Sequence, residues 1–181
     1  MRKWLSFLGA ITLLGTSTTS LVACNNIPQY NEDELQQIKK ENQINTNFQE
    51  IKENLEWICP QEQPFNTVDN KYYFVVCRGN ENDVWEIVKF KNDTEIYFNK
   101  WKKIKEFNNF DIVLCYTTFG NNLAKYKTAI SGIYKPGITG FIDVWENINN
   151  YIKAVYRWNG DEQKLPDLIV DNNGNVKVNS E

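Results

Sequence analysis

Two segments near the middle of the chain show the alternation and composition of β-strands. Lys71 to Arg78 reads KYYFVVCR and Val84 to Lys91 reads VWEIVKFK, so both are rich in aromatic and β-branched side chains. In the second segment the apolar side chains recur with the two-residue period of a strand. The polar sequence GNEND separates the two. We therefore predict a β-hairpin over residues 71–91.

Two further strands are predicted after this hairpin. Asp111 to Phe119, DIVLCYTTF, is apolar almost throughout, which is typical of a central strand covered on both faces. Tyr126 to Lys135, YKTAISGIYK, has strand composition and is followed by Pro136-Gly137, a pair that interrupts regular structure.

The hydrophobic period changes in the segment FIDVWENINNYIKAVYRW, residues 141–158. Its apolar residues fall within about 120° of a helical wheel, and its charged residues lie on the opposite side. These apolar positions are Phe141, Val144, Trp145, Ile148, Ile152, Val155 and Tyr156. The pattern predicts a long amphipathic helix centred on Val144 to Arg157.

Shorter signals flank these elements. In TNFQEIKENLEWI, which starts at Thr46, apolar residues recur at helical spacing, and Thr46 with Gln49 matches a capping box. Pro60 would end this helix. Near the C-terminus, DLIVDNNGNVKV predicts a hairpin in which Asn173-Gly174 supplies the positive φ angles of a tight turn.

This order of elements predicts an α+β fold. We expect an antiparallel-rich sheet with the one long amphipathic helix packed on a face, in a single domain over residues 46–181. Residues 24–45 are polar with isolated apolar positions. We expect a tether with helical tendency there, and an exposed, partly helical stalk is the alternative.

The first residues have the pattern of an export signal. Two basic residues precede an apolar run from Trp4 to Leu14, and a small polar segment follows. The run of about 12 residues is shorter than the roughly 20 that span a bilayer as a helix. We expect residues 1–23 to be a signal peptide.

The end of this segment, Leu21, Val22, Ala23 and Cys24, resembles the bacterial lipobox. The resemblance implies that a diacylglyceryl group joins the Cys24 sulfur and that cleavage occurs before Cys24, which then carries two acyl chains such as palmitate. Two chains on one residue give stable anchoring, whereas one chain does not. The alternatives are an ordinary cleaved signal with an incidental cysteine and an uncleaved helix.

The longer stretch GAITLLGTSTTSLVACNN, residues 9–26, resembles the start of spiroplasma-type lipoproteins, which belong to the wall-less Mollicutes. This resemblance implies a protein anchored on the outer face of the cell membrane. It implies no activity, ligand, cofactor or catalytic residue.

Composition excludes several kinds of chemistry. The 181 residues contain no histidine, which rules out histidine-activated nucleophiles and histidine metal ligands. The net charge is −3, and the leader holds Arg2 and Lys3 but no acid, so the mature chain is more acidic still. We therefore expect no nucleic-acid partner. Asp171 to Asn175 has the oxygen side chains of a calcium loop, but Val176 stands where that loop needs its glycine and no glutamate follows at the bidentate position. We expect a plain hairpin turn there, with no metal site and no cofactor.

Two places qualify as a candidate binding surface. In NKWKKIKEF the basic residues Lys100, Lys102 and Lys103 surround Trp101, and such a basic amphipathic segment suits anionic lipid or polyanions. The alternative is a solvated face whose apolar residues point to the core. Trp158, with Arg157, follows the predicted helix and is the best candidate for an exposed tryptophan, although core packing is the alternative.

Three cysteines remain once Cys24 carries lipid: Cys59, Cys77 and Cys115. We interpret Cys77 and Cys115 as buried strand residues, and a bridge between them is the alternative.

From these features we expect a membrane-anchored surface lipoprotein with a non-catalytic binding role, toward a host or envelope protein or glycan. The alternative function is a carboxylate-dependent hydrolase acting on glycans, using pairs such as Glu81 and Asp83. Two carboxylates about 5 to 9.5 Å apart in a deep cleft would favour that alternative.

Overall fold

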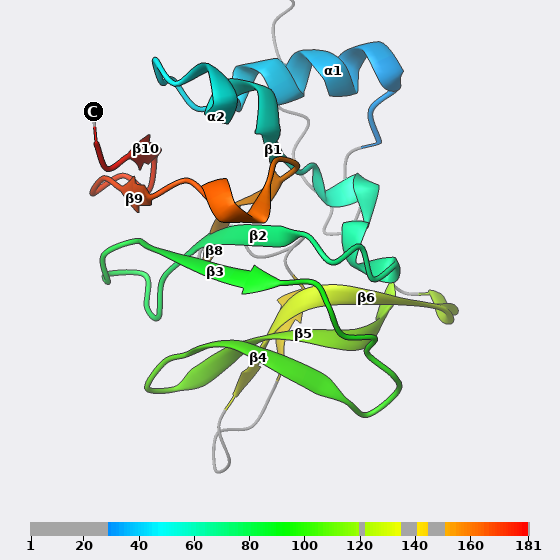
Figure 1. Ribbon diagram of the computed structural model, residues 1–181. Coiled ribbons are helices and arrows are strands. Elements are labelled where there is room, and N and C mark those ends of the chain that lie inside the picture. The colour runs from blue at the N-terminus through cyan, green and yellow to red at the C-terminus, as the bar shows by residue number, and fades with distance from the viewer. Residues whose placement is uncertain (1–28, 120–121, 135–140, 145–150, 181) are drawn as a thin grey trace, which may run out of the picture.

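The computed structural model describes residues 29–119, 122–134, 141–144 and 151–180 (Figure 1). These residues are mostly β-structure, with two short helices, α1 (Glu32–Glu41) and α2 (Gln49–Asn54), near the start. Within the described residues, no helix is long and apolar enough to cross a membrane. Short 3₁₀ turns are η1 (Pro60–Glu62), η2 (Pro64–Asn66) and η4 (Glu162–Lys164).

The strands form three antiparallel sheets. The central sheet has the order β1 (Leu55–Trp57), β8 (Ile152–Trp158), β2 (Tyr72–Cys77) and β3 (Glu86–Lys91). The outer sheet has the order β4 (Trp101–Glu106), β5 (Phe110–Phe119), β6 (Asn122–Tyr134) and β7 (Phe141–Val144). The terminal hairpin pairs β9 (Leu168–Val170) with β10 (Val176–Val178).

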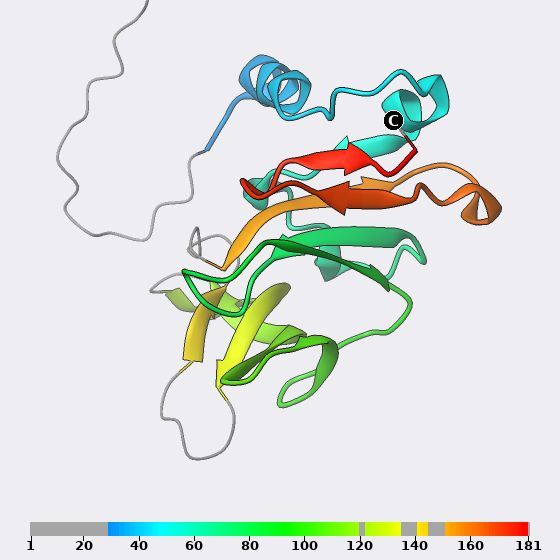
Figure 2. The same ribbon diagram turned by 90° about the vertical axis from the view of Figure 1, so that its left-hand side faces the viewer.

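Figure 2 shows these parts as layers, with the helices and the terminal hairpin on one side of the central sheet and the outer sheet on the other. Two apolar clusters fill the two interfaces. Tyr73 and Val75 of β2 face the outer sheet, where they join Ile112 and Leu114 of β5. The intervening Phe74 packs with residues of α2 and the terminal hairpin. Alternate residues of β2 therefore serve two cores, as the two-residue period of a strand requires.

The predicted α+β fold with a long helix is wrong. The described parts of residues 141–158 are the strands β7 and β8, and residues 145–150, including Trp145, lie outside the described residues. The cause is a β-bulge: Val76 pairs with Ala154 but Cys77 pairs with Ile152, which skips Lys153.

The bulge places Ile152 and Val155 in the same cluster, toward the outer sheet, although they are three residues apart. Ala154, Tyr156 and Trp158 pack on the opposite side of β8. A strand that is buried on both faces and carries a bulge thus reproduces the i, i+3, i+4 spacing of a helix.

Other predicted elements are confirmed. β2 and β3 form the expected hairpin, and β5 and β6 match the two later strand segments. The terminal hairpin closes as predicted, but only Gly174 has a positive φ, of 76°. The helix predicted from Thr46 is shorter than expected, because α2 ends at Asn54 and the chain continues as β1.

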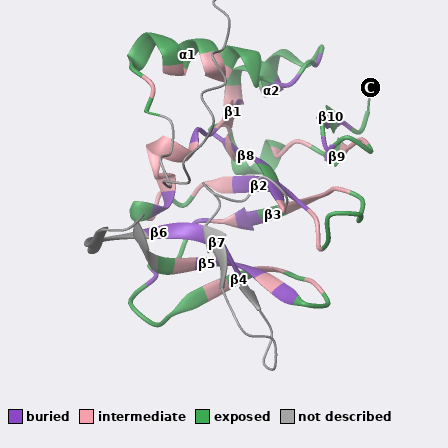
Figure 3. Ribbon diagram, turned by 180° about the vertical axis from the view of Figure 1, so that it is seen from behind, coloured by how far each residue is buried: buried purple, intermediate pink, exposed green. Residues whose placement is uncertain are grey.

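The segment expected to be a tether contributes to the folded unit from Gln29 onward. Asn31 and Glu34 form a capping box at the start of α1. Although α1 is largely exposed (Figure 3), Lys39 on it forms ion pairs with Glu56 and Glu62. Ile44, after α1, is buried beside the central sheet.

Candidate binding surface

Three large aromatic side chains are exposed within five residues of one turn. Tyr97 is 62% exposed, Phe98 65% and Trp101 58%. The backbone N–H of Lys100 donates to the carbonyl of Tyr97 at 2.9 Å, and Asn99 has the left-handed φ of 61° that asparagine tolerates better than most residues. We call residues 97–101 the aromatic turn.

Residues before the turn hold it in place. The buried Asn92 donates through its side-chain amide to the carbonyl of Thr67 at 2.9 Å and to Asp69 at 3.0 Å. Ile96 is buried in the core between the two large sheets. The aromatic turn is therefore displayed on an anchored loop, so its exposure is a feature of the folded state.

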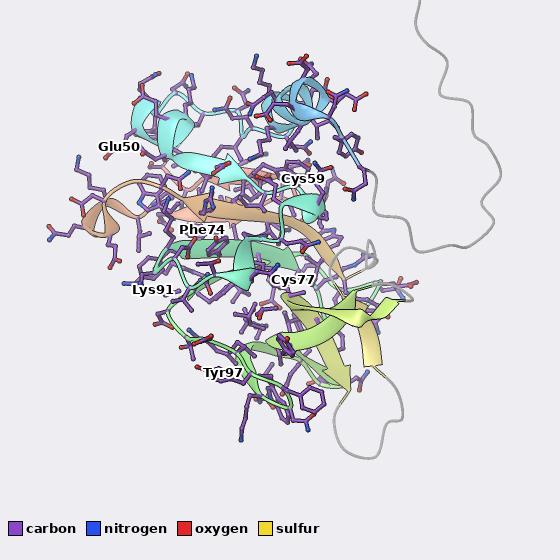
Figure 4. All side chains as sticks on the ribbon, turned by 90° about the vertical axis from the view of Figure 1, so that its right-hand side faces the viewer. Glu50, Cys59, Phe74, Cys77, Lys91 and Tyr97 are labelled. Atoms are coloured by element: carbon purple, nitrogen blue, oxygen red, sulfur yellow. The ribbon has the colours of Figure 1, made fainter. Side chains whose placement is uncertain are left out.

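The aromatic turn lies far from the N-terminal helices. Figure 4 places Tyr97 at the opposite end of the molecule from Glu50 of α2. Trp101 starts β4 and pairs with Cys115 of β5, which ties the turn to the outer sheet. Exposed aromatic clusters of this kind mark interaction sites, because large rigid rings bury much area at low entropic cost.

The predicted basic surface is largely neutralised. Lys102 pairs with Asp93 at 2.5 Å, Lys103 with Asp111 at 2.8 Å, and Lys105 with Glu86 at 2.5 Å. These residues lie on the strand β4, so the expected amphipathic turn is a paired edge of a sheet. Lys100 and Trp101 stay exposed at the start of this strand and belong to the aromatic turn.

Trp158 is not a surface residue. Its side chain is 2% exposed, and its indole N–H donates to the carbonyl of Asp161 at 2.9 Å. As a β8 residue it points to the same side as Tyr156. The prediction of an exposed Trp158 is therefore wrong, because it assumed a helix that ends before this position.

Arg157 takes part in a structural ion network. It donates to Glu56 at 2.6 Å, and Lys39 of α1 and Asn159 donate to the same carboxylate. Burial alone would raise the pKa of Glu56, but these donors outweigh it and lower the pKa to about 2. The network joins α1 to β1 and β8, and it engages Nη2 of Arg157.

The carboxylates considered for a glycan hydrolase lie on the surface. Glu81 and Asp83 lie exposed in the β2–β3 loop. A general acid needs a raised pKa, whereas hydrogen bonds lower the pKa of Glu56, Asp93 and Asp171.

The described residues contain no group of three metal-ligating side chains. Asp171, at the expected hairpin turn, accepts from the backbone N–H groups of Asn173 and Asn175 at 2.9 Å each. Its oxygens are engaged in closing the turn.

The described cysteines fit the prediction of buried thiols in part. Cys59 and Cys77 are buried and free, and Cys115 is half-buried. Burial raises the pKa of Cys77 to about 12, so this thiol is unreactive at neutral pH. The alternative bridge from Cys77 to Cys115 is not formed.

Cys24 and the lipobox residues Leu21, Val22 and Ala23 lie outside the described residues. Sequence reasoning selected Lys100 and Trp101 but missed Tyr97 and Phe98. The available signal was the adjacent aromatic pair in the polar run NDTEIYFNK. Comparison of the chain with protein-family models, curated proteins and solved structures finds no match.

Proposed function

We propose that this protein is a lipid-anchored surface protein whose folded domain binds a molecule outside the cell without catalysing a reaction on it. The export signal and the lipobox support the anchor. The exposed aromatic turn is the observation that carries the binding role. The occupied or exposed carboxylates and the absence of histidine support a non-catalytic role.

The anchor would hold the domain close to the bilayer. Four residues, and thus five residue-to-residue steps, separate Cys24 from Gln29, the first described residue. Such a segment spans at most about 18 Å when fully extended. Because α1 follows directly and packs on the domain, the aromatic turn at the opposite end would face away from the membrane.

Metabolic labelling tests the anchor. Labelled palmitate is expected to enter the wild-type chain and not a Cys24→Ala variant, and the variant should leave the membrane fraction. Equal labelling of both chains would refute lipidation at Cys24.

A pull-down tests the binding role. The full-length chain in detergent micelles is incubated with solubilised host membranes and with the glycans released from them. We expect enrichment that a Tyr97→Ser/Phe98→Ser/Trp101→Ser variant reduces by at least about tenfold, since aromatic anchors dominate such interfaces. The matched control is Phe48→Ser, an exposed aromatic residue at the start of α2. Absence of enrichment, or equal enrichment by the triple variant, would contradict the role.

A further inference from the structure

The rings of the aromatic turn form a convex surface. The turn belongs to the loop that joins β3 of the central sheet to β4 of the outer sheet. Tyr97, Phe98 and Trp101 each keep more than half of their surface exposed, whereas the preceding Ile96 is buried. The bond from the Lys100 N–H to the Tyr97 carbonyl reverses the chain between the rings. The three aromatic side chains therefore stand on a protruding turn.

The charges next to the rings are balanced. Asp93 and Lys102 pair at 2.5 Å and neutralise each other. Between them in sequence, the charged residues are Glu95 and Lys100. Glu95 accepts from the hydroxyl of Tyr97 at 2.6 Å. Lys100 is exposed, and none of the described carboxylates forms an ion pair with it. One anion and one cation thus flank the rings, so the segment has no net charge that favours a surface of one sign.

These residue types match the interfacial region of a lipid bilayer. Tryptophan and tyrosine concentrate there, because their rings have an apolar body and a polar group that stays at headgroup level. Exposed apolar rings that enter this region are removed from water. Lipid adapts its shape to a convex turn, whereas a protein partner would have to supply a matching pocket for each ring. The convex shape thus favours a lipid surface over a protein.

The charge balance selects among lipid headgroups. Phosphatidylcholine carries one phosphate and one quaternary ammonium group, so it offers both signs. The ammonium group would lie on the face of Trp101, since tryptophan is the strongest aromatic partner of such cations, and Glu95 would add attraction. The Lys100 amine would pair with the phosphate. An anionic lipid such as phosphatidylglycerol would meet Lys100 favourably and Glu95 unfavourably. The segment therefore fits a zwitterionic headgroup best.

We propose that the aromatic turn docks on the phosphatidylcholine surface of a second membrane. The membrane that holds the anchor is a poor candidate for this contact, because Tyr97 lies at the opposite end of the molecule from Glu50 of α2 (Figure 4). The chain would then join two bilayers, one through Cys24 and one through the aromatic rings. The inference rests on the proposed function, because it names the partner of the same turn.

Vesicle capture tests the proposal. The full-length chain is held on beads through a C-terminal tag, and fluorescent phosphatidylcholine vesicles are added. β10, the last strand, lies on the side of the central sheet away from the outer sheet, so the tag leaves the aromatic turn accessible (Figure 2). Every chain in the experiment carries the same N-terminal segment, and the contribution of that segment to capture is therefore common to all of them.

We expect the wild type to capture at least about fivefold more vesicles than a Tyr97→Ser/Phe98→Ser/Trp101→Ser variant. Phe48→Ser, the matched control at the start of α2, should stay within about twofold of the wild type. Trp101→Phe, which keeps a ring, should lose less capture than Trp101→Ser. Higher salt should change capture by less than about twofold, since salt does not screen the insertion of rings. Thermal unfolding checks that each variant is folded.

Three results would overturn the lipid partner: equal capture by the wild type and the triple variant, capture of phosphatidylglycerol vesicles alone, or capture only of vesicles that carry host membrane proteins. The last result would assign the turn to a protein. Failure here is separable from failure of the proposed function. Host molecules enriched in the pull-down without vesicle capture would keep the binding role and reject the lipid. Vesicle capture without such enrichment would keep the lipid and reject a discrete host protein or glycan.

Discussion

At the residue scale, Glu56 joins three parts of the chain. Its carboxylate accepts hydrogen bonds from Lys39 of α1, from Arg157 of β8 and from Asn159, which follows β8. Burial would lower the pKa of Lys39, but the bonds to Glu56 and Glu62 outweigh it and raise that pKa. Removing one partner from a half-buried ion network therefore costs more stability than removing one from an exposed pair.

The first prediction concerns pH. The pKa of Glu56 is about 2 in the folded state and 4.5 ordinarily, so its contribution is fully present above pH 4.5 and is lost as the pH falls toward 2. Glu56→Gln should lower the free energy of unfolding at pH 7 by about 1–2 kcal/mol, after allowance for partial solvent screening. Urea denaturation should show a smaller difference in the free energy of unfolding between wild type and variant at pH 3 than at pH 7.

The control for this experiment is Glu53→Gln, an exposed residue of α2, which should show a small effect at both pH values. If Glu56→Gln lowers the free energy of unfolding equally at pH 7 and pH 3, the Glu56 charge does not stabilise the fold.

The second prediction concerns Gly174. Its φ is 76°, and a Cβ atom there would lie 2.8 Å from Cγ of Trp85. Gly174→Ala should therefore destabilise the protein by about 2 kcal/mol, through backbone strain and the displaced ring. Thermal unfolding measures the effect, and Asn172→Ala in the same turn serves as the control. A variant as stable as the control would contradict this geometry.

At the element scale, the hydrophobic pattern identified the strands whose apolar and polar residues alternate regularly. The hairpin β2–β3 and the terminal hairpin follow from sequence because polar segments rich in asparagine and glycine separate their strands. β8 could not be identified in this way, because the bulge at Lys153 gives Ile152 and Val155 the spacing of a helix. Whether a strand is covered on both faces depends on elements that are distant in sequence, so the hydrophobic period of one segment does not reveal it.

The third prediction concerns the segment before Thr46. Removing residues 29–45 would delete α1, including Lys39, and the buried residue Ile44. The core residues that pack against Ile44 would then be exposed to solvent. A chain starting at Thr46 should lose about 2–4 kcal/mol relative to one starting at Gln29. Denaturant unfolding of the two chains measures this. Equal stability would show that α1 and its linker act only as a tether.

At the scale of the whole molecule, the layers separate two ends for which we propose different roles. α1 and the start of the described chain lie at one end, and the aromatic turn lies at the other (Figure 4). Sequence reasoning reached Lys100 and Trp101 because they stand in a visible basic run. Tyr97 and Phe98 were out of its reach, since their exposure depends on Asn92 and Ile96 being buried against other parts of the chain.

The most direct measurement is cysteine labelling on intact cells. Lys100→Cys places a thiol in the aromatic turn, and the parent chain supplies the background of Cys59, Cys77 and Cys115. If Cys24 anchors the protein on the outer face, a membrane-impermeant maleimide should label the variant on intact cells, in the membrane fraction, well above the parent. Labelling that appears only after lysis would contradict a surface lipoprotein that presents this turn to the outside.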